Sequence, residues 1–320
     1  MQKESSEKFE YSKVLVTGGA GFIGSYLVEA LVKKGVQVIV VDTLLRGNKI
    51  HPQIFDQIEF HNIDVCDETK IDKLCVGVNC IFHLAAILGV DIVADNPVET
   101  METEVRGMLS VAHAAIKNNV AKIIYASTSG VYGHHSLEQS VTEDVMIDPR
   151  TSYAMAKRYN EIYLAAMHEE KNLTCIAVRF FNVYGHRQDN RMVIPRFFEQ
   201  ALANEPLSVY GTGQQTRDFT WVEDAIEATL LLAEKVRGFE IFNVSNEREE
   251  SIDTLSRMIV DLTKSTSKIM YVNAPVKRYD YEVGRRFGSS FKLMQFTGYK
   301  PTTSLQHGLS EIYKFMIRKV

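Results

Sequence analysis

The sequence predicts an α/β fold in which a doubly wound parallel sheet carries a second, smaller α/β lobe. Short β-branched runs such as KVLVTG and VQVIVVD alternate with helical patterns through about the first 182 residues. Strands that alternate with helices imply a parallel sheet covered on both faces. The alternation becomes irregular after about residue 183, which indicates that a second lobe begins there.

The expected elements follow from apolar runs and helical periodicity. In the first part, strands are expected at 13–18, 36–42, 58–67, 79–86, 121–129 and 173–185, and helices at 22–35, 97–118 and from Tyr153 onward. In the second part, helices are expected at 193–206, 222–235 and 251–264, and strands at 207–211 and 241–245. The predicted division is a flexible tail at 1–10, a sheet domain at 11–182 and a lobe at 183–320. The strand near Phe242 is expected to return to the main sheet.

Composition narrows the classes of function. A chain of 320 residues can bury one large core or two modest ones. The net charge of −4 argues against a general nucleic-acid binder, and no apolar run approaches the ~20 residues that span a bilayer. The polar start MQKESSEKFE lacks the apolar stretch of a secretory signal. Four scattered cysteines without CxxC spacing predict reduced thiols in a cytoplasmic protein, with no metal site.

A glycine-rich turn follows the first strand. Gly18, Gly21 and Gly24 are spaced G-x-x-G-x-x-G, and Phe22 and Ile23 lie within the same turn. Here Gly18 permits the tight turn, Gly21 lets the backbone approach a pyrophosphate, and Gly24 lets the helix pack on the strand. The helix N-terminus adds free N–H groups and partial positive charge. This context predicts a dinucleotide-binding (Rossmann) fold.

Asp42 ends the second strand, 18 residues beyond Gly24. A carboxylate there can accept from both ribose hydroxyls of NAD and would repel the 2′-phosphate of NADP. The alternative is an aspartate that merely starts a turn. Arg46 can soften the repulsion, but we expect NAD as the cofactor. Asp64, with Val65 beside it, can accept from the adenine amino group or can form a strand-end turn.

Tyr153 and Lys157 lie four residues apart in TSYAMAKRYNEIY, so they share one face of a helix. An ammonium beside a phenol favours the phenolate and lowers the pKa of the phenol. Such a tyrosine can take a proton from a substrate hydroxyl while a hydride leaves for a nicotinamide. The alternative is an aromatic ring at the core edge with a solvated lysine.

The motifs TGGAGFIG, HLAA, STSGVYG, YAMAK and RFFNVYG occur in this order. With them the chain resembles the extended short-chain dehydrogenase/reductases, and among these the NAD-dependent nucleotide-sugar epimerase/dehydratase family of the UDP-glucose 4-epimerase type. The resemblance covers residues 11–318. It implies an NAD-dependent epimerase that inverts C4 of a UDP-sugar through a transient 4-keto intermediate.

The resemblance also implies roles for particular residues. The base would be Tyr153 with Lys157 as its helper, and Thr128 would orient the reacting hydroxyl. Ser127 and Ser129 flank that threonine and can share its work, or the cluster can simply satisfy backbone groups. The remaining cofactor contacts implied are Leu84, Ala85, Ala86 and Phe181. The substrate contacts implied are Ser127, Ser129, Asn182, Val193, Tyr210, Gln214, Arg217 and Arg278.

Two of the implied arginines concern the substrate's phosphates. Arg217 would clamp the pyrophosphate, since a guanidinium fork suits phosphate, and a solvated surface arginine is the alternative. Arg278 fits the family's second arginine only if the register shifts by one residue. This sequence also departs from the family's pattern at Glu104, where the family has an asparagine before Val-x-Gly.

Rival reactions on this scaffold need further acids. The resembling dehydratases place an Asp-Glu pair directly after the threonine, and the resembling decarboxylases place a Glu just before VYG. This chain has Ser129 and Gly130 there, which favours epimerisation. The open alternatives are a dehydratase, a reductase or a C3/C5 epimerase, and a dinucleotide-sensing module without turnover. Neither the sugar nor the nucleotide base follows from the sequence.

A homodimer is also expected. The helices at 97–118 and from Tyr153 would lie side by side, with an apolar outer face at Met155, Tyr159, Ile162 and Ala166. In resembling proteins these helices pair into a four-helix bundle. The alternative is that the second lobe covers them.

Overall fold

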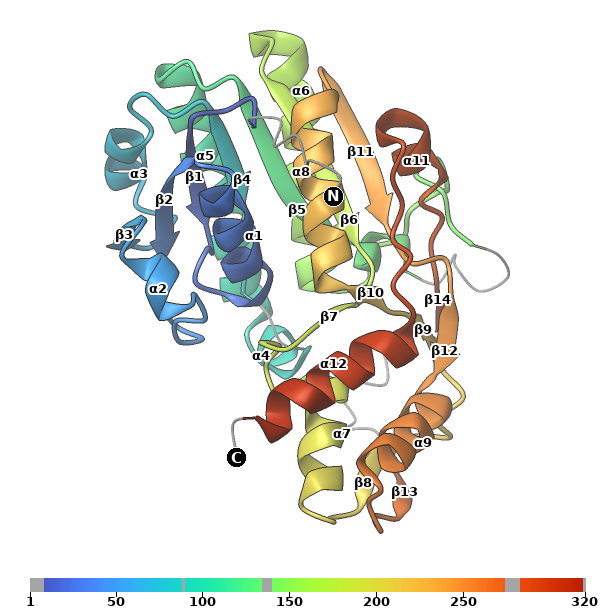
Figure 1. Ribbon diagram of the computed structural model, residues 1–320. Helices are drawn as coiled ribbons and strands as arrows, with labels where there is room; N and C mark the ends of the chain where they lie inside the picture. Colours follow the sequence, from blue (N-terminus) through green and yellow to red (C-terminus); the bar gives the residue numbers. More distant parts are fainter. Residues whose placement is uncertain (1–8, 88–89, 134–139, 274–282, 319–320) are drawn as a thin grey trace.

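The computed structural model describes residues 9–87, 90–133, 140–273 and 283–318 (Figure 1). At its centre lies a sheet of seven strands in the order β11-β6-β5-β4-β1-β2-β3, with every neighbouring pair parallel. The strands are β1 Lys13–Thr17, β2 Gln37–Asp42, β3 Glu59–Asn62, β4 Cys80–His83, β5 Lys122–Thr128, β6 Thr174–Phe180 and β11 Phe239–Val244. The predicted doubly wound parallel sheet is confirmed.

Helices cover both faces of this sheet because successive strand side chains point to opposite faces. In β1, Val14 and Val16 pack toward α1 and α8, whereas Leu15 packs toward α3, α5 and α6. The helices are α1 Phe22–Lys33, α3 Glu68–Leu74, α5 Pro97–Lys117, α6 Ser152–Lys171 and α8 Val222–Lys235. Shorter segments are α2 Pro52–Phe55, α4 Val90–Asp95 and the 3₁₀ turn η1 Ser129–Tyr132.

The last strand of the main sheet comes from the second half of the chain. Strand β11 pairs with β6, with Phe242 opposite Val178. The chain therefore crosses between the two parts more than once, and the division at residue 182 stays a proposal.

The smaller lobe consists of short sheets and helices that lie beyond the end toward which β11 points in Figure 1. Its small sheets are β12-β9-β14, β8 with β13, and β7 with β10. Its strands are β7 Val183–Tyr184, β8 Leu207–Tyr210, β9 Thr216–Asp218, β10 Thr220–Trp221, β12 Glu249–Ser251, β13 Ile269–Val272 and β14 Arg285–Arg286. Its helices are α7 Val193–Leu202, α9 Ile252–Thr263 and α12 Leu305–Ile317, whereas α11 Phe291–Thr297 packs beside α8 and β11 of the main sheet (Figure 1).

The expected tail at 1–10 needs a correction. Residues 1–8 lie outside the described part of the chain, but Phe9 is buried in the core and packs edge-on against Tyr11. Glu10 pairs with Arg237, the two atoms Oε1 and Nη2 being 2.7 Å apart. Two aromatic side chains and one ion pair thus anchor the chain from Phe9 onward.

Candidate active site

The residues expected to hold the cofactor lie where parallel strands end. Gly18 follows β1, Asp42 ends β2, and Leu84 follows β4. The strand order reverses between β1 and β4, and crevices at such switch points bind ligands in doubly wound folds. The sheet topology thus brings these residues to one edge.

The turn after β1 has room only for glycine at two positions. Gly18 has a φ of +69°, and a Cβ there would lie 2.6 Å from the backbone nitrogen of Ala85. At Gly24, a Cβ would lie 2.1 Å from the carbonyl oxygen of Gly18. Helix α1 starts directly after Gly21, which has no side chain to cap it. The N–H groups of its first turn, including those of Phe22 and Ile23, are thus left to an anion such as a pyrophosphate.

Asp42 holds this turn against the end of β2. Its carboxylate accepts hydrogen bonds from Ala20 N at 3.0 Å and from Leu44 N at 2.8 Å. Burial raises the pKa of the Asp42 carboxyl above its usual value, and these backbone bonds work against that rise. A carboxylate offers about four acceptor positions, so Asp42 can accept from a ribose hydroxyl as well as from its turn.

Arg46 and Asp64 lie nearer the solvent. Arg46 Nη1 is 3.9 Å from Asp189 Oδ2, which connects the loop after β2 to the loop before α7. The exposed Asp64 accepts from Cys66 N at 2.8 Å, as in the turn considered from the sequence. Its neighbour Val65 is buried beside Gly107. A contact of Asp64 or Val65 with adenine stays a prediction.

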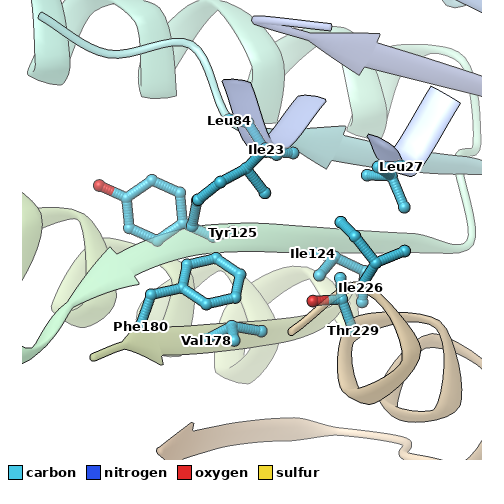
Figure 2. A pocket seen from close by; sticks show the side chains of 10 residues that line it. Ile23, Leu27, Leu84, Ile124, Tyr125, Val178, Phe180, Ile226 and Thr229 are labelled. Atoms are coloured by element: carbon cyan, nitrogen blue, oxygen red, sulfur yellow. The ribbon is translucent and has the colours of Figure 1, made fainter. Parts of the chain in front are cut away.

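Behind the glycine turn the structure is tightly filled. Leu84 N donates to the backbone oxygen of Thr17 at 3.0 Å, and Ala85 N donates to Thr17 Oγ1 at 3.3 Å. Figure 2 shows Ile23 and Leu84 on the wall of an apolar cavity of about 10 Å³ that Phe180 also lines. A cavity of this size holds one water at most, and its apolar walls have few groups that could hydrogen-bond to a water. It is packing space beneath the turn, and Ala86 continues the loop beside it.

Tyr153 and Lys157 share one face of α6, as their spacing predicts. The helix begins at Ser152, and Thr151 caps it by accepting from Ala154 N at 3.0 Å. Lys157 is 1% exposed, and its Nζ lies 5.3 Å from the centroid of the Tyr153 ring.

The electrostatic expectation for this pair is wrong for the protein without ligands. Lys157 Nζ lies 2.9 Å from Glu104 Oε2, and both side chains are almost fully buried. Burial, and next the Glu104 carboxylate, raise the pKa of Tyr153 well above its usual value. Lys157 is not among the groups that offset this rise, and its ammonium contacts a carboxylate that the sequence places 53 residues away.

Thr128 ends β5 close to the first turn of α6. Its Oγ1 accepts from Gly130 N at 3.1 Å. A Cβ at Gly130 would lie 3.3 Å from Thr128 Oγ1 and 3.5 Å from the Cβ of Ala154, the residue after Tyr153. The hydroxyl of Thr128 thus lies near the helix turn that carries the phenol.

Of the two serines beside Thr128, Ser127 is placed differently from the expectation, and a substrate contact of Ser129 stays a prediction. Ser127 Oγ donates to Glu161 Oε1 at 2.6 Å, and Arg179 Nε donates to the same oxygen at 2.8 Å. Ser127 is therefore part of a buried network between β5, β6 and α6, because alternate residues of a strand face opposite ways. Ser129 is 3% exposed. The structure does not bring the Ser127 hydroxyl to the side of Thr128.

Phe181 and Asn182 follow β6 and are held by the protein itself. Phe181 is fully buried, with its ring against Gly288 and Tyr132. Asn182 Nδ2 donates to the Asp218 carbonyl at 3.0 Å. Their contacts with cofactor and substrate stay predictions.

The other expected substrate residues are spread over the small lobe. Val193 begins α7, Tyr210 ends β8 under the guanidinium of Arg196, and Gln214 is exposed in the turn that follows. Arg278 lies outside the described residues.

Arg286 is a residue that the sequence reasoning missed. Strand β14 pairs with β9 so that Arg286 lies opposite Arg217. Burial, and next the charge of Arg217, lower the pKa of Arg286 to about 10, and its Nε has no hydrogen-bond partner among the described residues. Two neighbouring guanidinium groups suit a diphosphate. The motif GRRF in the sequence carried no sign of this pairing, which depends on contact between distant strands.

Two features are absent from the described residues. No helix there is long and apolar enough to cross a bilayer. Nor do three or more His, Cys, Asp or Glu side chains there form a cluster that could hold a metal ion.

Comparison with known proteins agrees with this geometry. Residues 14–245 match the sequence profile described as the NAD dependent epimerase/dehydratase family. A UDP-N-acetyl-alpha-D-glucosaminuronate decarboxylase from Bacillus cytotoxicus is 39% identical over 93% of this chain and 96% of its own. The UDP-glucose 4-epimerase of Thermotoga maritima, solved with UDP-glucose, is 30% identical with a TM-score of 0.89, covering 96% of this chain and 99% of its own.

A third relative was solved with the cofactor. The UDP-glucose 4-epimerase of Thermus thermophilus, in complex with NAD, is 28% identical with a TM-score of 0.87 and covers 96% of this chain and 100% of its own. The cofactor of this chain is NAD, whose pyrophosphate and ribose fit the glycine turn and Asp42. The chain belongs to the NAD-dependent epimerase/dehydratase family, whose members modify nucleotide sugars.

Proposed function

We propose that this protein inverts C4 of a UDP-sugar through a transient 4-keto intermediate. The observation that carries the proposal is that Thr128 lies close to the first turn of α6, which contains Tyr153. Gly130 lies between the two, at the same end of the sheet as the glycine turn. Gly130 contributes no acid where resembling decarboxylases have one. Inversion needs only one group that moves a proton at the C4 oxygen.

The residues divide the work as follows. When bound, NAD supplies a reversible hydride acceptor. Tyr153 takes the proton of the C4 hydroxyl and later returns it to the ketone oxygen, and Thr128 orients that hydroxyl. Because the pKa of Tyr153 is raised, its phenol holds the proton firmly, so turnover should increase with pH.

The diphosphate of the substrate would bind in the small lobe. Arg217 is held by the carbonyls of Thr216 and Val283, to which its Nη1 donates at 2.7 Å and 2.8 Å. This leaves the guanidinium fixed in place beside Arg286. These two neighbouring cations would hold the diphosphate, position the sugar over the proton-transfer group and leave the sugar ring free to present either face.

Decarboxylation of a nucleotide uronate is a second candidate, because the Bacillus cytotoxicus relative carries out that reaction on a related scaffold. A sugar oxidised at C4 with a carboxylate on C5 is a β-keto acid. It can lose CO₂ as the C5–carboxyl bond breaks, with the electron pair held as an enolate on the ketone. A proton must then reach C5, and Gly130 supplies none.

One experiment separates these functions. Purified protein with NAD is incubated with UDP-glucose, UDP-N-acetylglucosamine, UDP-glucuronate and UDP-N-acetylglucosaminuronate, and products are followed by NMR. We expect a C4 epimer with its carbon count unchanged. Release of CO₂ from a uronate would establish the decarboxylase instead. Binding of NAD without conversion of any sugar would favour a sensor role.

We also propose that the protein is a homodimer. Met155, Tyr159 and Ile162 on the outer face of α6 are 45%, 46% and 55% exposed. Three large apolar side chains on one helix face favour burial against a second copy. Light scattering after size exclusion tests this, and a monomer at micromolar concentration would contradict it.

A further inference from the structure

A buried polar cluster lies behind Tyr153, between α5, α6 and the main sheet. It contains Glu104 from α5 and Lys157 from α6, with Glu104 2% and Lys157 1% exposed. The Lys157 ammonium also lies 4.7 Å from the ring centroid of Tyr125 on β5. Tyr125 in turn stacks on His83 of β4, with ring centroids 5.6 Å apart.

The position of Glu104 is fixed by more than its charge. Asn160 Nδ2 on α6 donates to the backbone oxygen of Glu104 at 3.1 Å and to Tyr125 Oη at 2.9 Å. The carboxylate cannot turn toward solvent, since its side chain is fully enclosed. Lys157 therefore contacts a carboxylate and lies close to the rings of Tyr125 and Tyr153.

We propose that Glu104 is a positioning residue that holds Lys157 and keeps the working pH of Tyr153 more alkaline than the lysine alone would set it. This inference rests on the proposed role of Tyr153 in proton transfer. Its physical basis is neutralisation: burial raises the pKa of Glu104, but the charge and hydrogen bond of Lys157 and a backbone bond from Ile87 oppose that rise and favour the carboxylate. Seen from the phenol, the ammonium and the carboxylate form a pair whose charges largely cancel, whereas an unpaired buried ammonium would favour the phenolate.

Other groups near Glu104 do not supply a competing charge at neutral pH. Burial and the Lys157 charge lower the pKa of His83 to about 3, so that ring is neutral. Burial, and next Glu104, raise the pKa of Tyr125 well above its usual value, so that phenol is neutral as well. Burial raises the pKa of the Cys66 thiol, which keeps it protonated.

Two charged residues remain in the surroundings. Arg106 is on the same helix as Glu104, and its charge works to lower the pKa of Cys66 in the loop after β3. Glu161 on α6 is bound by Arg179, whose Nη2 donates to its Oε2 at 2.8 Å. Glu104 is thus the carboxylate that contacts Lys157 directly, and its removal is the decisive perturbation.

The test follows Tyr153 itself and needs no substrate. Tyrosine labelled with ¹³C at Cζ reports ionisation of each phenol by NMR, and a Tyr153→Phe variant identifies the signal among the 14 tyrosines. In Glu104→Gln, which keeps the shape and removes the charge, we expect Tyr153 to ionise at a pH lower by at least about one unit, a tenfold change. The pH–rate profile should move by the same amount with KM unchanged.

A double variant makes the test independent of packing. In Glu104→Gln/Lys157→Met both charges are absent, so ionisation of Tyr153 should return close to the wild-type pH. If the Glu104→Gln shift persists in the double variant, or if Glu104→Gln leaves the Tyr153 titration where it was, the proposal is wrong. Should no sugar be converted, the titrations still decide the role of Glu104, so the two proposals fail separately. Glu104→Asn serves as the single variant if Glu104→Gln does not fold.

Discussion

Replacing Gly18 by alanine tests whether the turn after β1 shapes the cofactor site. The left-handed backbone at this position, with a φ of +69°, costs a non-glycine residue about 1 kcal/mol. In addition, the new Cβ would lie 2.6 Å from Ala85 N, whereas ordinary contact begins at 3.4 Å. The backbone after β4 must therefore move by about 0.8 Å, the difference between these two distances.

That movement should weaken NAD binding. The segment after β4 is tied to β1 through hydrogen bonds from Leu84 N and Ala85 N to Thr17, so a shift there distorts the turn as well. Misplacement on the ångström scale costs binding energy, and we expect Kd for NAD to increase about 10- to 100-fold, or roughly 1.4–2.7 kcal/mol. Titration calorimetry measures the Kd, and urea unfolding measures the stability.

Gly35→Ala is the matched control. Gly35 has a φ of +75° with nothing within 4 Å of its Cβ position, so alanine there brings the same backbone strain without a clash. Gly35→Ala should lose about 1 kcal/mol of stability, and Gly18→Ala should lose more because its clash adds to the same strain. Only Gly18→Ala should lose NAD affinity. Equal weakening of NAD binding in the two variants, or wild-type affinity in Gly18→Ala, would refute the reasoning.

Three further predictions concern the proton, the phosphate and the buried histidine. Tyr153→Phe should retain NAD binding by calorimetry but lose about 10²- to 10⁴-fold in turnover by NMR, and near-full activity would exclude Tyr153 as the base. Arg286→Gln should raise KM for the nucleotide sugar at least about tenfold with NAD affinity unchanged, and an unchanged KM would remove Arg286 from the diphosphate site. His83, whose pKa is lowered to about 3, stays neutral when folded but gains a proton when unfolded below about pH 6.5. The free energy of unfolding should therefore decrease as the pH is lowered, by about 2 kcal/mol between pH 6.5 and 5. Urea unfolding of His83→Asn should show a smaller pH dependence. An identical pH dependence in both proteins would contradict the assignment.

Much of the fold follows from local patterns. Apolar runs such as VQVIVVD and the glycine spacing of TGGAGFIG are short-range signals, and they predicted the doubly wound sheet and the turn at its edge. Strand ends and helix starts decide where Asp42, Thr128 and Tyr153 lie. These predictions need no knowledge of which distant segments touch.

The parts that were missed depend on contacts between distant segments. Alternation along β5 turned the Ser127 hydroxyl toward Glu161, away from the side of Thr128. The tail prediction failed at Phe9, because its burial depends on a core surface built by later segments. In neither case does the local sequence name the partner.

The sequence by itself determined the class of sheet, the glycine turn and the spacing that brings Tyr153 and Lys157 to one helix face, because periodicity and backbone sterics act over a few residues. Only the tertiary structure decided the charge around that pair. Packing of α5 on α6 places Glu104 2.9 Å from Lys157, and pairing of β14 with β9 places Arg286 opposite Arg217. Electrostatic effects on a buried group depend on distance through space, and that distance is set only when the helices and strands pack together.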